Sequence, residues 1–285
     1  MDTKLISVLF KNEPEIYSNY KVVFSGRFAE VYQYTIPVVL NRKPKARKPE
    51  NVNADMIFDK DFDFVNLRAE EYRKRRYTRA FSQISRFIEC NFKYGKCAFL
   101  TLTFEYNMKS MKVAKNVFFK PFIARMKLFY PDFVYLGVTE FQKRGAVHFH
   151  LIINQYIDKD VLLYCWPWGR PEVKKPYSSH GLGIYFSKYL TKNHNDPRYR
   201  EHKFYFNSHS SKYRKIVKPK IVYAKNAEII FNFLMKNAVP VYSHVYRIPD
   251  FTKSYFKDFE IVNYVRAEKY NIAKFLPLDL RSEIL

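Results

Sequence analysis

A short hairpin in the middle of the chain constrains the fold more than any other feature. Residues 133–141 (FVYLGVTEF) and 146–153 (AVHFHLII) are apolar stretches of strand length, rich in β-branched and aromatic residues. Gly145 ends the short loop between them and is placed for the left-handed residue of a three-residue hairpin turn. This loop length sets Glu140 opposite His148. The sequence therefore predicts an antiparallel sheet with this hairpin at its centre.

Two histidines stand on the second strand of this hairpin. Side chains alternate along a strand, so His148 and His150 share one face, and the predicted register brings Glu140 to the same face. A four-residue loop would instead turn Glu140 away. Two imidazoles and a carboxylate accept several divalent ions. With a phosphodiester substrate we expect Mg²⁺ or Mn²⁺; the alternatives are a zinc hydrolase and two ordinary strand histidines.

The remaining pattern predicts an α+β fold, a central antiparallel sheet with helices packed on it. Further strands are expected as a pair within 19–40, at 97–104 and at 203–206, and helices at 66–91, 113–129, 181–193 and 226–236. Pro121 is expected in a first helical turn or at a kink.

We expect three regions along the chain. Residues 1–60 are predicted to be a β-rich extension followed by a basic linker, because Arg42–Pro49 combines five basic residues with two prolines. Residues 61–220 carry the motifs described below and are the predicted catalytic domain. Residues 221–285 form a C-terminal extension of unassigned role.

The charge balance favours a nucleic-acid partner. Fifty Lys and Arg against 27 Asp and Glu give a formal charge of +23, and neutralised phosphates release condensed counterions. The alternative is an AT-rich genome, in which lysine accumulates for coding reasons. The candidate DNA-binding residues are Arg73, Lys74, Arg75, Arg76, Arg79, Lys143 and Arg144. For the helical ones, the alternative is the solvated face of a core helix.

Three cysteines without a CxxC pair argue against a disulfide framework or a structural zinc site. No secretory segment and no membrane-spanning run is seen in the sequence, so neither export nor membrane insertion is expected.

A second motif, YFSKYLTK at 185–192, repeats Tyr-x-x-Lys twice. On a helix, residues four apart share a face, so Tyr185 and Tyr189 stack with Lys188 and Lys192 beside them. A phenol needs nearby cations or a metal to act as a nucleophile at neutral pH. With 24 tyrosines in the chain, such pairs also arise by chance. The order of the two motifs is the stronger signal.

In that order, FLTLTF (99–104), EFQKRGAVHFHLII (140–153) and the tyrosine–lysine segment resemble the three motifs of HUH endonucleases. They look most like those of the two-tyrosine rolling-circle initiators of single-stranded DNA phages and small plasmids. The resemblance implies metal binding by His148, His150 and Glu140. It also implies cleavage of single-stranded or hairpin origin DNA through a 5′-phosphotyrosine formed by Tyr185 or Tyr189.

The resemblance further implies a bacterial host cytoplasm and a host helicase and polymerase as partners. An HUH transposase would use the same chemistry, and a non-catalytic single-strand DNA-binding protein would explain the charge and the aromatic content. A histidine-triad hydrolase is excluded, because it needs a third histidine where Ile152 stands.

Overall fold

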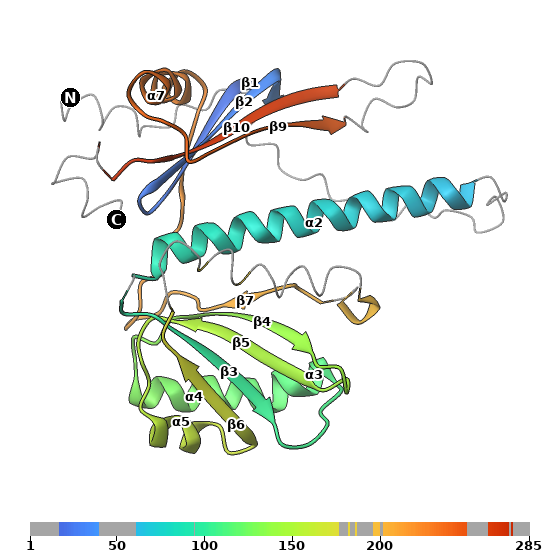
Figure 1. The fold of residues 1–285 in the computed structure, drawn as a ribbon, viewed down its shortest axis with the longest axis vertical. Coiled ribbons are helices and arrows are strands. Elements are labelled where there is room, and N and C mark those ends of the chain that lie inside the picture. Colours follow the sequence, from blue (N-terminus) through green and yellow to red (C-terminus); the bar gives the residue numbers. More distant parts are fainter. Residues whose placement is uncertain are drawn as a thin grey trace. The chain divides into compact units, whose positions relative to one another are not determined.

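A computed structural model describes residues 17–39, 61–93, 95–176, 182, 186, 196–199, 202–249, 262–273 and 275. The chain forms two compact units: a central unit, Ala54–Val217, and a terminal unit that combines Met1–Asn53 with Lys218–Leu285 (Figure 1). Among the helices described in these ranges, none combines the length and apolarity needed to cross a membrane.

The central unit is built on a five-stranded sheet in which every pair of neighbours is antiparallel. Its strands are β3 (Ala98–Phe104), β4 (Tyr135–Phe141), β5 (Val147–Ile153), β6 (Gly169–Lys174) and β7 (Phe206–Asn207). The order β6-β3-β5-β4-β7 puts the histidine strand in the middle, as predicted. The short strand expected at 203–206 is shifted to the two residues of β7.

Helices complete the central unit. They are α2 (Asp61–Asn91), α3 (Met111–Val113), α4 (Lys120–Phe129), α5 (Lys159–Cys165) and the short 3₁₀ helix Pro197–Tyr199. The single helix predicted at 113–129 is instead α3, a π-helical segment over Ala114–Phe119, and then α4, with Pro121 in the first turn of α4. Pro121 lacks a backbone N–H, which is tolerated there because first-turn amides have no partner within their own helix.

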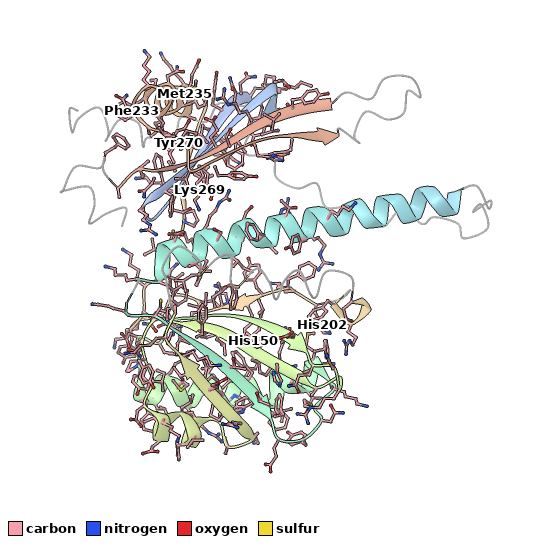
Figure 2. The ribbon with its side chains drawn as sticks, viewed as in Figure 1. His150, His202, Phe233, Met235, Lys269 and Tyr270 are labelled. Carbon is pink, nitrogen blue, oxygen red and sulfur yellow. The ribbon has the colours of Figure 1, made fainter. Side chains whose placement is uncertain are left out.

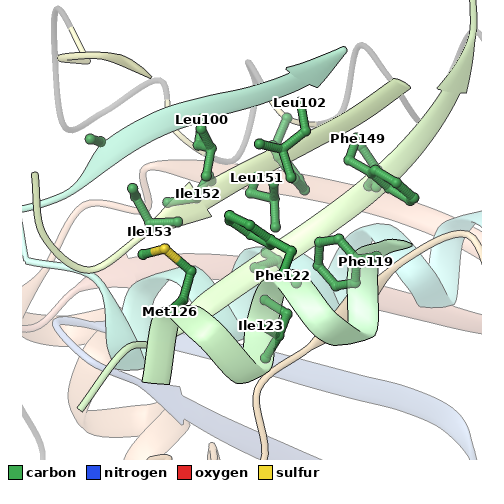
Figure 3. Packing of buried hydrophobic residues seen from close by; sticks show 14 of the residues in the cluster. Leu100, Leu102, Phe119, Phe122, Ile123, Met126, Phe149, Leu151, Ile152 and Ile153 are labelled. Atoms are coloured by element: carbon green, nitrogen blue, oxygen red, sulfur yellow. The ribbon is translucent and has the colours of Figure 1, made fainter. Parts of the chain in front are cut away.

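The core lies between α4 and one face of the sheet. Leu100 and Leu102 of β3 and Phe149 of β5 are fully buried on that face. Phe122 and Met126 of α4 are buried against them (Figure 3). This packing fixes the opposite face of β5, because adjacent residues of a strand point to opposite sides. The two histidines therefore lie on the face away from α4.

Gly137 of β4 leaves room for an aromatic ring. A Cβ added there would lie 2.4 Å from Cε2 of Phe206, whose ring is itself held 4.9 Å from that of Phe119. We expect Gly137→Ala to lower the free energy of unfolding by about 1–3 kcal/mol through overpacking. Denaturant titration measures the change. Adding Phe206→Leu to Gly137→Ala should recover part of the loss; no recovery would contradict this explanation.

The terminal unit is a second antiparallel sheet with the order β8-β1-β2-β10-β9. Its elements are β1 (Tyr17–Ser25), β2 (Phe28–Val39), β8 (Lys220–Tyr223), α7 (Ala224–Asn237), β9 (Tyr242–Pro249) and β10 (Val262–Asn271). Strands from both ends of the sequence therefore share one sheet. The strand pair predicted within 19–40 and the helix predicted at 226–236 are confirmed as β1, β2 and α7.

Candidate active site

The hairpin has the register that its loop predicts. Gly145 adopts φ +85°, and its N–H donates to the Gln142 carbonyl at 2.8 Å. The Gln142 N–H donates in turn to the Ala146 carbonyl at 2.8 Å, and Glu140 pairs with His148 across the strands. The left-handed turn thus brings the carboxylate to the face that carries the imidazoles.

Strand β3 contributes two threonines to the same face. Thr101 pairs with His150 and Thr103 with His148, so β3, β5 and β4 lay a row of polar side chains across the sheet. The two imidazole ring centres are 6.0 Å apart. Figure 2 labels His150 on β5. The first motif therefore supplies side chains to the histidine face as well as a strand to the core.

His150 is held from both ring nitrogens. Its Nε2 lies 2.7 Å from Oε2 of Glu140, and its Nδ1 lies 3.3 Å from Oγ1 of Thr101. The side chains of His150 and Glu140 are only 12% and 17% exposed. With the ring neutral and protonated at Nε2, that N–H donates to the carboxylate and the threonine hydroxyl donates to Nδ1. This pair fixes the plane of the His150 ring.

His148 has a different environment. It is 8% exposed, and its buried Nε2 has no hydrogen-bond partner among the described residues. Burial, together with the nearby His150 and Arg144, lowers the pKa of His148 to about 4, although Glu140 opposes the shift. His148 is therefore a neutral imidazole near pH 7. A neutral imidazole with an unpaired nitrogen is available to bind a metal ion.

The donors fit a divalent cation by chemistry, although they are not arranged as a finished ligand cluster. Within the described ranges, no three His, Cys, Asp or Glu side chains already form such a cluster. Two ligands held about 2.1 Å from one ion at a right angle are about 3 Å apart. The 2.7 Å between His150 and Glu140 is within a few tenths of an ångström of that separation. His148, His150 and Glu140 are the residues that could hold an ion here.

Arg144 adds positive charge beside the histidines. Its Nη2 donates to the Phe104 carbonyl at 3.1 Å, and its Nε donates to the Gln142 side chain at 2.9 Å. These bonds draw the guanidinium back from the hairpin loop toward the end of β3. Lys143 beside it is exposed. Both candidate DNA-binding residues of the hairpin therefore lie at the end of the sheet that carries His148.

The basic residues of α2 divide between solvent and structure. Lys74 and Arg79 are exposed. Arg76 donates to the His202 carbonyl at 3.3 Å and lies 5.2 Å above the Phe204 ring, so it has a packing role that the charge pattern did not reveal. The side chains of Arg73 and Arg75 lie outside what the structure describes.

The predicted nucleophiles and their lysines, Tyr185, Tyr189, Lys188 and Lys192, lie outside the described residues, as does most of the helix expected at 181–193. Two residues of that stretch are described. Leu182 and Phe186 are helical and 4% and 0% exposed, in the core of the central unit.

Tyr199 is a buried tyrosine that the motif analysis did not single out. Its hydroxyl donates to the Thr139 carbonyl at 2.9 Å, and its ring lies 5.4 Å from Phe141. Burial raises the pKa of Tyr199 above that of a free phenol. It is therefore held as a neutral phenol with a structural role.

Comparison with known protein families singles out the region that contains these motifs. Residues 97–194 match a family of replication-associated proteins, described as Replication-associated protein of the ORF2 type. None of the curated proteins and none of the solved structures compared with the chain matches it. The matched stretch begins just before β3, includes the histidine hairpin and ends after the tyrosine–lysine segment. The match supports a replication initiator, with DNA as its partner.

Proposed function

We propose that this protein is a rolling-circle replication initiator of the two-tyrosine HUH type, which nicks single-stranded DNA and becomes joined to the cut end. The observation that carries the proposal is the meeting of His148, His150 and Glu140 on one face of the central strands. This site lies inside the stretch that matches a replication-associated family.

The reaction we propose is a transesterification. The phenol oxygen of Tyr185 or Tyr189 attacks the scissile phosphorus and loses its proton, the Tyr O–P bond forms, and the P–O3′ bond breaks. The leaving oxygen takes a proton and becomes a free 3′ hydroxyl that can prime synthesis. Lys188 and Lys192 would stabilise the phenolate. The phosphotyrosine ester keeps the energy of the broken bond, so a later strand can be joined without ATP.

The metal site follows from the same residues. His148, His150 and Glu140 would hold Mg²⁺ or Mn²⁺, which supplies Lewis-acid polarisation of the scissile phosphate when bound. His148 offers a neutral nitrogen with no other partner among the described side chains. Glu140 balances the positive charge, and Arg144 is placed to contact a phosphate at the His148 end of the site.

Covalent capture tests the proposal directly. The full-length protein is incubated with Mn²⁺ and labelled, random-sequence single-stranded oligonucleotides, then denatured and run on a gel. We expect a labelled protein–DNA band that EDTA abolishes, and recovered DNA with free 3′ hydroxyl ends. Salt-sensitive binding with no covalent band and no response to EDTA would overturn the proposal and favour a non-catalytic DNA-binding protein.

Thr101 provides a graded test of the metal site. Thr101→Val keeps the shape of the side chain but removes the hydroxyl that holds Nδ1 of His150. We expect about 10- to 100-fold weaker apparent Mn²⁺ affinity, read from the Mn²⁺ dependence of adduct yield, with the maximal yield less affected. Thr101→Ser should restore the parent affinity, and equal affinity in the valine variant would contradict this positioning role.

A further inference from the structure

The sheet of the terminal unit has two chemically different faces. Val22 and Phe24 of β1 and Val31 of β2 are buried on one face together with Ile230 and Phe231 of α7. Figure 1 shows α7 lying along one side of this sheet. The apolar residues of these strands that point toward α7 form the core of the unit.

The face opposite α7 is rich in rings and cations. Strand pairing places Lys21, Tyr32, Ala267 and His244 side by side in one row across four strands. Alternation along the strands adds more residues to the same side. We call this side the aromatic face; its residues include Lys21, Phe28, Tyr32, Tyr34, Tyr242, His244, Tyr246 and Lys269.

The cations on this face lie over rings. Nζ of Lys21 is 4.2 Å from the centre of the Tyr32 ring, and Nζ of Lys269 is 4.2 Å from that of Phe28. Figure 2 labels Lys269 on the terminal sheet. Among the described residues of the face, Glu30 is the one carboxylate, paired across the strands with Lys269. Lysines outnumber it, so the face carries a positive balance.

The edge strand β9 presents a ladder of rings. The centroids of Tyr242 and His244 are 6.1 Å apart, and those of His244 and Tyr246 are 6.1 Å apart with planes only 16° from parallel. Tyr242 is 55% exposed and His244 is also exposed. Such a ladder offers flat surfaces at regular intervals along a strand, on which bases can stack.

We propose that the aromatic face binds single-stranded DNA independently of the nicking site, with bases stacked on the rings of β2 and β9 and phosphates near Lys21 and Lys269. Stacking on aromatic rings tolerates any base sequence, and lysines track a phosphate backbone. A protein partner would be favoured by an apolar exposed face, whereas this face combines hydroxyl-bearing rings with cations. The proposal does not rest on the tyrosine chemistry of the central unit.

Binding of the full chain to fluorescent oligothymidylate tests the proposal. Anisotropy is measured in EDTA, so that no metal-dependent cleavage contributes. The double variant Tyr242→Ala, His244→Ala should bind about 10- to 100-fold more weakly, as expected for the loss of one or two stacked bases. Tyr242→Phe keeps the ring and should bind like the parent. His148→Leu should also bind like the parent, which separates this face from the nicking site.

A matched control comes from the neighbouring strand. Tyr264 of β10 is 54% exposed but points to the α7 side of the sheet, because its neighbour Val265 pairs with Tyr34. Tyr264→Ala should therefore leave DNA affinity unchanged. Equal weakening by Tyr264→Ala and Tyr242→Ala, or parent affinity in the double variant, would overturn the proposal. Tighter binding to oligouridylate than to oligothymidylate would also overturn it, in favour of RNA.

Discussion

Replacing His148 by leucine is expected to abolish the covalent protein–DNA adduct without unfolding the protein. The adduct should fall by about 10²- to 10⁴-fold, the range that corresponds to losing several kcal/mol of metal-derived transition-state stabilisation. The same change removes a buried nitrogen that has no partner in the described part of the chain. Because an unsatisfied buried polar group is unfavourable, the free energy of unfolding without metal should stay level or rise by about 1 kcal/mol.

Thermal unfolding with and without Mn²⁺ provides the second readout of this variant. An ion that binds only the folded state raises the unfolding temperature by mass action. The parent protein should therefore be stabilised by Mn²⁺, and His148→Leu should not. His209, which is exposed and lies outside the site, supplies the control: His209→Leu should keep both the adduct and the Mn²⁺ response. A His148→Leu protein that forms adduct at the parent level would refute the metal site.

Replacing Tyr185 and Tyr189 together by phenylalanine is expected to eliminate the adduct completely. Phenylalanine keeps the ring and removes only the oxygen that would attack phosphorus, so folding and metal binding should survive. Each single variant should retain adduct through the remaining tyrosine if both act, and only one should lose it if a single tyrosine cuts. Mass spectrometry of the nuclease-trimmed adduct identifies the modified residue.

Tyr199→Phe is the control for the tyrosine pair. Its hydroxyl bonds to the Thr139 carbonyl, so the variant should lose about 1 kcal/mol of stability and keep full adduct yield. Adduct that persists in the double variant Tyr185→Phe, Tyr189→Phe would exclude these residues as nucleophiles. Loss of adduct in Tyr199→Phe with the fold intact would move the chemistry to that residue instead.

Local rules explain why the histidine hairpin could be predicted from sequence. A three-residue loop ending in Gly145 fixes the parity of the strands, and parity alone decides that Glu140 and His148 share a face. The central position of β5 followed from its apolar residues at alternate positions. The contact between Thr101 and His150 was within reach of the same reasoning, but it required knowing that β3 is the other neighbour of β5.

The terminal sheet could not be predicted in this way. Its β2 and β10 strands pair although more than 200 positions separate Gln33 from Arg266 in the sequence. No local turn or spacing encodes such a pairing, and each hairpin alone resembles an isolated extension. The packing role of Arg76 was hidden for a similar reason, because its partners His202 and Phe204 come from a distant loop.

The pairing of β2 with β10 also has a consequence for how the chain is made. During synthesis, the β1–β2 hairpin leaves the ribosome before all of the central unit, whereas β8, β9 and β10 leave after it. The central unit can therefore complete its sheet first, while the early hairpin still has an unpaired edge at β2. Shortening the gene from either side would remove strands from one and the same sheet and leave the histidine hairpin untouched.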